Sequence, residues 1–300
     1  MLPGLSFLPE AKRQLLETLV DRLSEIEGVV AVVLGGSYAS GTFHEASDLD
    51  IGLYYEESAP FSIEDIRTVA QEAAENGNVT VTGFYEWGPW VNGGAWIHTP
   101  HGKVDFLYRN LNQVQRTIAE AREGIVHHDY DQQPTYGWYS VIYLAETQIC
   151  IPLYDPEGRV SQLKQEVATY PPKLKQKILA DSLWSVEFTL LHAHGFAAQG
   201  DVYNTAGCLT RAASSLTQAL FALNERYFIR DKKVMDTLAG FSILPAGYVN
   251  TLQDILAHPG RTAVELIQSV QAMEQVWRSV VALPGVEYAP RFQISGGKNR

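Results

Sequence analysis

The sequence predicts an α+β fold, in which an N-terminal mixed-sheet domain precedes an all-helical domain. Up to about residue 110, short valine-rich runs of strand length alternate with amphipathic segments of helix length. Beyond Pro172 the apolar residues recur mainly at helical spacing. A chain of 300 residues with 46% hydrophobic content is long enough to bury two cores. We therefore predict two domains, residues 1–125 and residues 126–300.

The first segments alternate between helix and strand. Residues 10–26 carry leucine, valine and isoleucine at helical spacing, which predicts an amphipathic helix. Residues 29–34 form a short valine-rich run that is typical of a buried strand. Residues 48–55 predict a second strand. Residues 62–75 predict a helix, with Ser62 as its N-cap.

Three further strands and a helix complete the first domain. Residues 79–87 and 95–99 are predicted as strands, because β-branched and aromatic residues are frequent in them. A turn at His101-Gly102 leads into a strand over residues 103–109. Residues 111–123 then predict a helix. The N-terminal part is therefore expected to contain a sheet with both parallel and antiparallel neighbours.

The second domain is predicted from two apolar stripes at helical spacing. Proline residues interrupt the chain between the first domain and the Pro171-Pro172 pair, after which the helical pattern is continuous. The stripes consist of Leu209, Ala212, Ala213, Leu216, Leu220 and Leu223, and of Leu266, Val270, Met273, Trp277 and Val280.

Composition and charge disfavour several classes of function. The net charge of −11 argues against a nucleic-acid partner, because such proteins need a basic surface that displaces counterions. No apolar run reaches the roughly 18 residues of a membrane span, and the N-terminus does not resemble a signal peptide. Cys150 and Cys208 form no CxxC pair, so neither a zinc site nor a disulfide framework is expected. We expect a soluble, cytoplasmic protein.

Three aspartates form the main candidate for a chemical site. Asp48 and Asp50 lie two residues apart on a predicted strand, so their side chains point to the same face. Asp105 lies between Val104 and Phe106, where an unpaired charge would be costly. Carboxylate oxygens suit Mg²⁺, which accepts one or two carboxylates together with substrate phosphates. We therefore predict that these three aspartates are catalytic and bind metal, as in two-metal sites that stabilise an attacking and a leaving oxygen.

A glycine-rich turn precedes the aspartates. Gly35 and Gly36 follow a predicted strand and would allow the backbone to approach a phosphate chain closely. The hydroxyl of Ser37 can donate a hydrogen bond to a phosphate oxygen. We predict that Gly35, Gly36 and Ser37 bind the substrate's phosphates.

These motifs, taken together, resemble those of the DNA polymerase β-like nucleotidyltransferase superfamily. The matching pattern is Leu34-Gly-Gly-Ser37, then Asp48-Leu-Asp50-Ile51, then an apolar-Asp-apolar strand at Asp105. It covers roughly residues 29–109 and implies a palm-like catalytic sheet. The helical second half resembles, in a more general way, that of antibiotic nucleotidyltransferases of the kanamycin, streptomycin and lincosamide types.

The resemblance implies a reaction as well as a fold. It implies Mg²⁺ or Mn²⁺, a nucleoside triphosphate donor such as ATP, and transfer of the nucleoside monophosphate to a hydroxyl with release of pyrophosphate. Residues 1–125 would form the catalytic domain, and residues 126–300 would bind a small-molecule acceptor, such as an aminoglycoside- or lincosamide-like antibiotic. A role in antibiotic resistance would follow. Some relatives share active sites across a dimer, so the resemblance is compatible with a homodimer.

Several assignments stay open at the sequence level. The general base is Asp105 or a glutamate, with Glu86, Glu146 and Glu187 as candidates. Lys232 is predicted to reach the triphosphate from the second domain; alternatively, it is a solvated cation near a helix end. The acceptor is a small molecule or a protein, and a nucleotide-binding sensor without turnover is a further alternative.

The aromatic stretch that ends at Trp96 also has two structural interpretations. Tyr85, Trp87, Trp90 and Trp96 lie between glycines, shortly before Asp105. They could form a stacking wall for a base or a sugar ring, or they could pack against one another in a hairpin.

Overall fold

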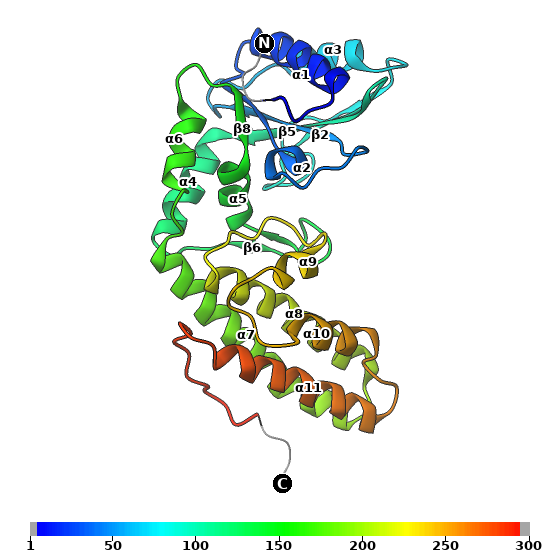
Figure 1. Cartoon of the computed structure of the whole chain (residues 1–300), viewed down its shortest axis with the longest axis vertical. Helices are drawn as coiled ribbons and strands as arrows, with labels where there is room; N and C mark the ends of the chain where they lie inside the picture. Colours follow the sequence, from blue (N-terminus) through cyan, green and yellow to red (C-terminus); the bar gives the residue numbers. More distant parts are fainter. Residues whose placement is uncertain (1–4, 295–300) are drawn as a thin grey trace. The chain divides into compact units, whose positions relative to one another are not determined.

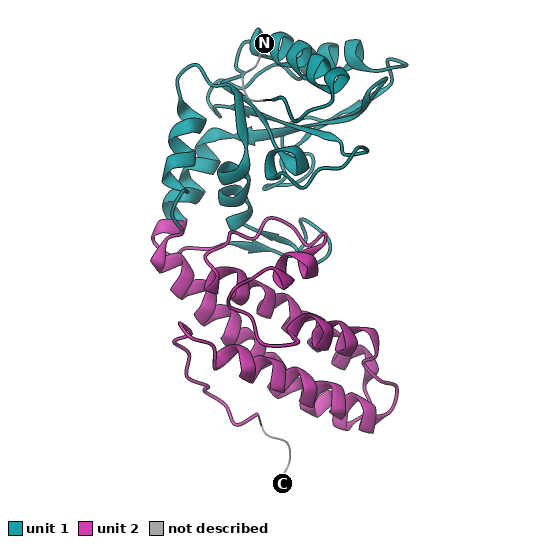
Figure 2. Cartoon of the chain, in the orientation of Figure 1, with its two compact units in different colours: residues 1–120, 127–169 teal, residues 121–126, 170–300 magenta. Residues whose placement is uncertain are grey.

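The computed structural model describes residues 5–294, which belong to two compact units (Figure 2). Unit 1 contains the residues up to 120 and residues 127–169, whereas unit 2 contains residues 121–126 and those from 170 onward. The predicted boundary between residues 125 and 126 therefore does not coincide with the division into units. The reason is strand pairing, because β8 (Ile151–Tyr154) joins the N-terminal sheet beside β1 (Ala31–Leu34).

Unit 1 is built on a six-stranded sheet with the order β3-β4-β5-β2-β1-β8. Strands β2 and β5 run parallel, and every other neighbouring pair is antiparallel. The mixed sheet of the predicted α+β fold is thus confirmed. The bounds of its remaining strands are Leu49–Tyr55 for β2, Val79–Val81 for β3, Gly94–Thr99 for β4 and Gly102–Asn110 for β5.

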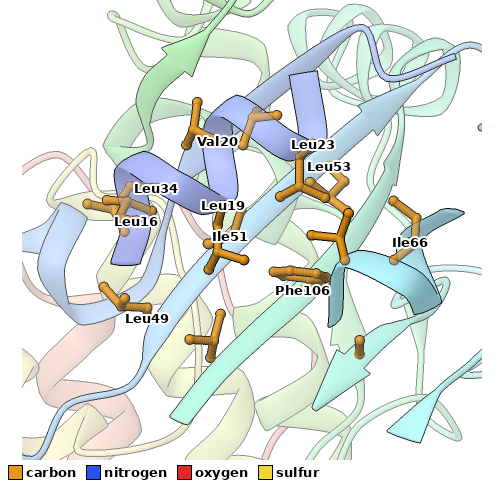
Figure 3. Packing of buried hydrophobic residues seen from close by; sticks show 14 of the residues in the cluster. Leu16, Leu19, Val20, Leu23, Leu34, Leu49, Ile51, Leu53, Ile66 and Phe106 are labelled. Atoms are coloured by element: carbon orange, nitrogen blue, oxygen red, sulfur yellow. The ribbon is translucent and has the colours of Figure 1, made fainter. Parts of the chain in front are cut away.

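Two helices, α1 (Glu10–Ser24) and α3 (Ile63–Ala73), cover one face of this sheet (Figure 1). Figure 3 shows the leucines of α1 packed against Ile51, Leu53 and Phe106 of the strands. Since side chains alternate along a strand, the odd-numbered residues of β2 enter this core and the even-numbered ones face the other side. Asp50 is therefore directed away from the helix-covered face.

The local signals for α3 are confirmed, but those for β3 are only partly correct. The Ser62 side chain accepts a hydrogen bond from Asp65 N at 3.3 Å and caps α3 as predicted. The strand predicted over residues 79–87 ends at Val81. It gives way to a loop, in which Tyr85 and Asn92 both have positive φ, 61° and 70°. Such left-handed backbone is incompatible with a continuing strand.

The remaining elements of unit 1 include four helices and a small hairpin. Helix α2 (Gly36–Ser40) follows β1, and α4 (Leu111–Arg122) follows β5 and continues to the edge of unit 2. The residues after 126 were expected to be helical throughout. They instead begin with the hairpin of β6 (His128–Asp129) and β7 (Trp138–Tyr139), followed by α5 (Val141–Ile149), β8 and α6 (Arg159–Glu166).

Unit 2 is helical in all the regular elements that residues up to 294 show. Helices α7 (Pro172–Ala198) and α8 (Val202–Leu223) form a hairpin, and Asp201 caps α8 by accepting a hydrogen bond from Asn204 N at 3.0 Å. Both predicted apolar stripes are buried, the first in α8 and the second in α11. The other helices are α9 (Val234–Ala239), α10 (Tyr248–Ala257) and α11 (Ala263–Val281). Within residues 5–294, none of the helices has the length and apolarity that crossing a membrane would require.

Candidate active site

The parallel pairing of β2 and β5 brings two of the predicted aspartates together. Asp50 and Asp105 are directly opposite each other in the register of these strands. Register partners project to the same face, so both side chains lie on the face away from α1 and α3. Asp48 immediately precedes β2 and, two residues before Asp50, follows the same alternation. All three residues are half-buried.

The electrostatics of Asp105 show that it interacts with Asp48. Burial is the main cause that raises the pKa of Asp105 above its usual value, and the negative charge of Asp48 raises it further. Lys103 and His98, which are register partners across β5 and β4, act in the opposite direction. The fold thus holds two carboxylates where their charges repel.

The chemistry of this donor set fits a hard divalent cation. All three side chains offer carboxylate oxygens, and a cation would relieve the repulsion between Asp48 and Asp105. Among residues 5–294, no group of three or more His, Cys, Asp or Glu side chains lies close enough together to hold a metal ion.

The glycine turn contacts Asp50 directly. Gly35 N donates a hydrogen bond to Asp50 O at 2.8 Å, which joins the turn to β2. Gly36 has a φ of +58°, and a Cβ at this position would lie 1.7 Å from Asp50 Oδ2. Only glycine fits both the backbone angle and the space. Ser37 lies in the first turn of α2, directly after the two glycines that contact Asp50.

Two tryptophans continue the same face of the sheet beyond Asp105. Trp96 of β4 is the register partner of Asp105, so Asp50, Asp105 and Trp96 form one row across three strands. The ring of Trp87 stacks on that of Trp96, with 4.8 Å between centroids and 21° between planes. Trp96 is 51% exposed. The two rings therefore pack against each other, but at the surface rather than within a hairpin core.

Two protein-family models match parts of the chain. The family model described as "Nucleotidyltransferase domain" matches residues 16–83, which include the glycine turn, Asp48 and Asp50. The chain carries a nucleotidyltransferase domain. A model described as "Domain of unknown function (DUF4037)" matches residues 141–232, which begin in α5 of unit 1 and end in unit 2. The chain is accordingly an enzyme of the nucleotidyltransferase class.

Among solved structures, the nucleotidyltransferase-like protein from Exiguobacterium sibiricum is similar to the chain. The identity is 8% and the TM-score is 0.44, with 91% of this chain and 75% of that chain covered. A search of curated proteins gave no match.

The glutamates considered as general bases differ in their surroundings. Glu146 accepts two hydrogen bonds of 2.8 Å from Arg109, one at each carboxylate oxygen. Glu187 lies in unit 2, is fully buried and accepts hydrogen bonds from Tyr288 Oη and two backbone amides. Both therefore have structural partners. Glu86 is exposed and accepts a hydrogen bond from Gly83 N at 2.9 Å, in the loop that carries Trp87. Of the candidates, Asp105 is the one that pairs with Asp50 in the register of the sheet.

Lys232 is exposed and lies in unit 2, two residues before α9. Its contact with the triphosphate stays a prediction.

Sequence reasoning missed the residues that hold the loop beside the site. Asn92 is completely buried, and its side chain bonds to Tyr85 N and to Tyr55 Oη. Gln132 bonds to the backbone of the same loop from a distant part of the chain. A polar residue before a Gly-Gly pair could have suggested a turn at Asn92. No local pattern could have linked Gln132 to the loop.

A surface pocket on the other side of the sheet is separate from these residues. It is lined by residues of α1 and α3 together with Pro100 and His101. None of the predicted site residues contributes to it, so we assign no chemistry to this pocket.

Proposed function

We propose that this enzyme transfers a nucleoside monophosphate, AMP from ATP, to a hydroxyl of a small-molecule acceptor and releases pyrophosphate. The observation that carries the proposal is the pairing of Asp50 with Asp105 in adjacent parallel strands, beside Asp48 and the glycine turn. An aminoglycoside- or lincosamide-like acceptor is the class we favour. An acidic protein with a net charge of −11 suits a cationic acceptor better than a polyanion.

In this proposal the aspartates would hold one or two divalent cations, Mg²⁺ or Mn²⁺. When bound, such ions neutralise the phosphates and lower the pKa of the attacking hydroxyl. Gly35 and Gly36 would let the triphosphate approach the backbone, and Ser37 would donate to a phosphate oxygen. Asp105 would orient the acceptor hydroxyl and accept its proton at a carboxylate oxygen. The acceptor oxygen then forms a bond to the α-phosphorus as the bond to pyrophosphate breaks.

Measurement of pyrophosphate release tests the proposal. The assay would use ATP, GTP, CTP and UTP with Mg²⁺, each against a panel of aminoglycosides and lincosamides. We expect release that depends on one class of acceptor and that is lost in Asp48→Asn and in Asp50→Asn, because each removes a metal-binding charge. Asp254→Asn, which changes an exposed aspartate of α10, is the matched control and should retain full activity. Undiminished activity in both site variants would refute the assignment.

Other results of the same assay would point to the alternatives. Labelled ATP that marks a protein and not a drug would indicate AMP transfer to a protein acceptor. Metal-dependent ATP binding, measured by calorimetry, without pyrophosphate release against either type of acceptor would indicate a nucleotide sensor.

A further inference from the structure

The stacked tryptophans lie in line with the aspartates but have no role in the chemistry described so far. We propose that the Trp87–Trp96 pair is the acceptor subsite of the transfer site, and that it takes a glycoside whose sugar ring packs flat against Trp96. This inference rests on the proposed function and adds to it the residues that bind the acceptor, which lie in unit 1 and outside the residues 126–300 that the sequence predicts for this role.

The backbone of β4 is shaped to hold the pair. Gly94 precedes Trp96 by two residues, so it lies on the same face of the strand. A Cβ at Gly94 would lie 1.9 Å from the backbone oxygen of Phe106 in β5 and 2.9 Å from Cζ3 of Trp87. The absence of a side chain at Gly94 therefore allows the close approach of β5 and also leaves room for the Trp87 ring, which stacks on Trp96.

Buried hydrogen bonds fix the loop that carries Trp87. The backbone of Trp87 donates to Asn92 O at 2.8 Å and accepts from Gln132 Nε2 at 3.0 Å. The side-chain oxygen of Asn92 accepts from Tyr85 N at 2.9 Å, and its amide donates to Tyr55 Oη at 2.7 Å. Asn92 itself is completely buried. The loop is thus rigidly held, although it presents an aromatic surface to solvent.

Gln132 fixes the loop a second time. Its Oε1 accepts hydrogen bonds from Trp90 N at 2.9 Å and Val91 N at 3.1 Å. It reaches the loop over Gly88, where a Cβ would lie 1.8 Å from Gln132 Nε2. Trp96 is 51% exposed, and an exposed aromatic face that is fixed in position suits a binding surface.

The order of the strands indicates whether the aromatic pair binds the acceptor or the nucleotide. The glycine turn follows β1, on one side of Asp50, whereas Trp96 lies in β4, on the other side of Asp105. Attacking and leaving oxygens lie on opposite sides of the phosphorus in phosphoryl transfer. With the departing pyrophosphate at the glycine turn, the attacking hydroxyl comes from the side of β4. The aromatic pair therefore receives the molecule that bears this hydroxyl.

The shape and the surroundings of the pair indicate a sugar ring. An indole offers a flat apolar face, on which the C–H groups of a pyranose can pack while its hydroxyls stay at the rim. Asp105, the register partner of Trp96, is the group next to that rim. A flexible chain would gain less from this surface, because it would lose more conformational entropy on binding.

Fluorescence titration tests the inference without any need for turnover. The probes are kanamycin A, a glycoside, and α,β-methylene-ATP with Mg²⁺, which the enzyme cannot cleave between the α- and β-phosphorus atoms. We expect kanamycin A to change the tryptophan fluorescence of the unmodified protein and of Trp184→Ala, which removes a partly exposed tryptophan of α7. The change should be lost in Trp96→Ala. The nucleotide should bind equally well to all three proteins and leave the Trp96 contribution unaltered.

Kinetics supply the second readout. With the acceptor that supports pyrophosphate release, Trp96→Ala should raise the KM for the acceptor about tenfold, as expected for the loss of one stacking contact. The KM for ATP should not change. Trp96→Phe should restore part of the affinity, because it keeps an aromatic face. A fluorescence response to the nucleotide that depends on Trp96 would overturn the inference in favour of a base-stacking site, and so would a lack of any response to kanamycin A.

The two proposals can fail separately. Asp48→Asn should abolish transfer but keep the response to kanamycin A. If all proteins bind kanamycin A through Trp96 yet none releases pyrophosphate, the transfer chemistry is wrong and the glycoside site stands. If pyrophosphate release requires Asp48 but is indifferent to Trp96, the acceptor subsite is wrong.

Discussion

The carboxylate of Asp105 occupies a position that disfavours its negative charge. It lies half-buried in a strand whose alternate residues, Val104 and Phe106, enter the core. Burial and the negative charge of Asp48 both disfavour the charged form of its carboxylate, and both raise its pKa. A residue chosen for stability alone would be neutral here. The proposed metal-binding role would account for a charge at this position.

We predict that Asp105→Asn stabilises the metal-free protein and abolishes transfer. Because the pKa of Asp105 is raised, the folded protein binds more protons than the unfolded chain between the ordinary carboxyl pKa and the raised one. The contribution of Asp105 to the free energy of unfolding therefore falls as the pH rises through this window. Asn removes both the cost and this pH dependence. Thermal unfolding of both proteins in EDTA at several pH values measures the difference in stability and its pH dependence.

The control for this variant is Asp254→Asn, which should leave both the Tm and the activity unchanged. A Tm for Asp105→Asn below that of the unmodified protein at neutral pH would show that the carboxylate has a stabilising partner instead.

At the level of elements, the sequence predicts those whose signals are local. The alternation in β2, the valines of β1 and the cap at Ser62 each specify their own segment, and all are confirmed. The pairing of β2 with β5 was only implied by the family resemblance. The loop after Val81 was mistaken for strand, since its aromatic residues have high strand propensity. Hydrogen bonds override that propensity. They come from the buried Asn92 within the loop and from Gln132, which lies far along the chain.

The glycine turn provides a prediction about an element. In Gly36→Ala, the new Cβ would overlap Asp50 Oδ2 and displace this carboxylate. We expect loss of Mg²⁺-dependent ATP binding, measured by calorimetry, together with a destabilisation of about 1–2 kcal/mol from the positive φ. Gly41→Ala is the matched control. Gly41 ends α2 with a φ of +72°, and a Cβ there would meet no atom within 4 Å.

The matched pair separates backbone strain from the contact with Asp50. Gly41→Ala should lose only the stability that the positive φ costs, whereas Gly36→Ala should lose more because of its overlap with Asp50, and only Gly36→Ala should lose nucleotide binding. Equal ATP affinity in the two would mean that the position of the Asp50 carboxylate does not matter for binding.

For the whole molecule, the division into units depends on contacts between segments that are distant in sequence. Strand β8 pairs with β1 and removes the exposed edge that β1 would otherwise present. Glu146 of α5 makes a bidentate ion pair with Arg109 of β5, and Arg109 is only 4% exposed. Neither contact has a local sequence signal. The boundary predicted at residue 125 depends only on the change from strand-like to helical spacing of the apolar residues and on the prolines that follow.

We predict that a chain ending at residue 125 is far less stable than one ending at residue 169. The shorter chain lacks β8, which leaves the edge of β1 unpaired, and lacks Glu146, which leaves the buried Arg109 without its carboxylate. The loss of one partner of a fully buried ion pair costs about 3–5 kcal/mol, and the cost is smaller here because the Glu146 side chain is 27% exposed. Urea unfolding, followed by circular dichroism, should show a cooperative transition for the longer chain and aggregation or a broad transition for the shorter one. In the longer chain, Glu146→Ala should reproduce the part of the lost stability that comes from leaving Arg109 without its carboxylate partner. Equal midpoints for the two truncated chains would mean that residues 127–169 are dispensable to the sheet that carries Asp48, Asp50 and Asp105.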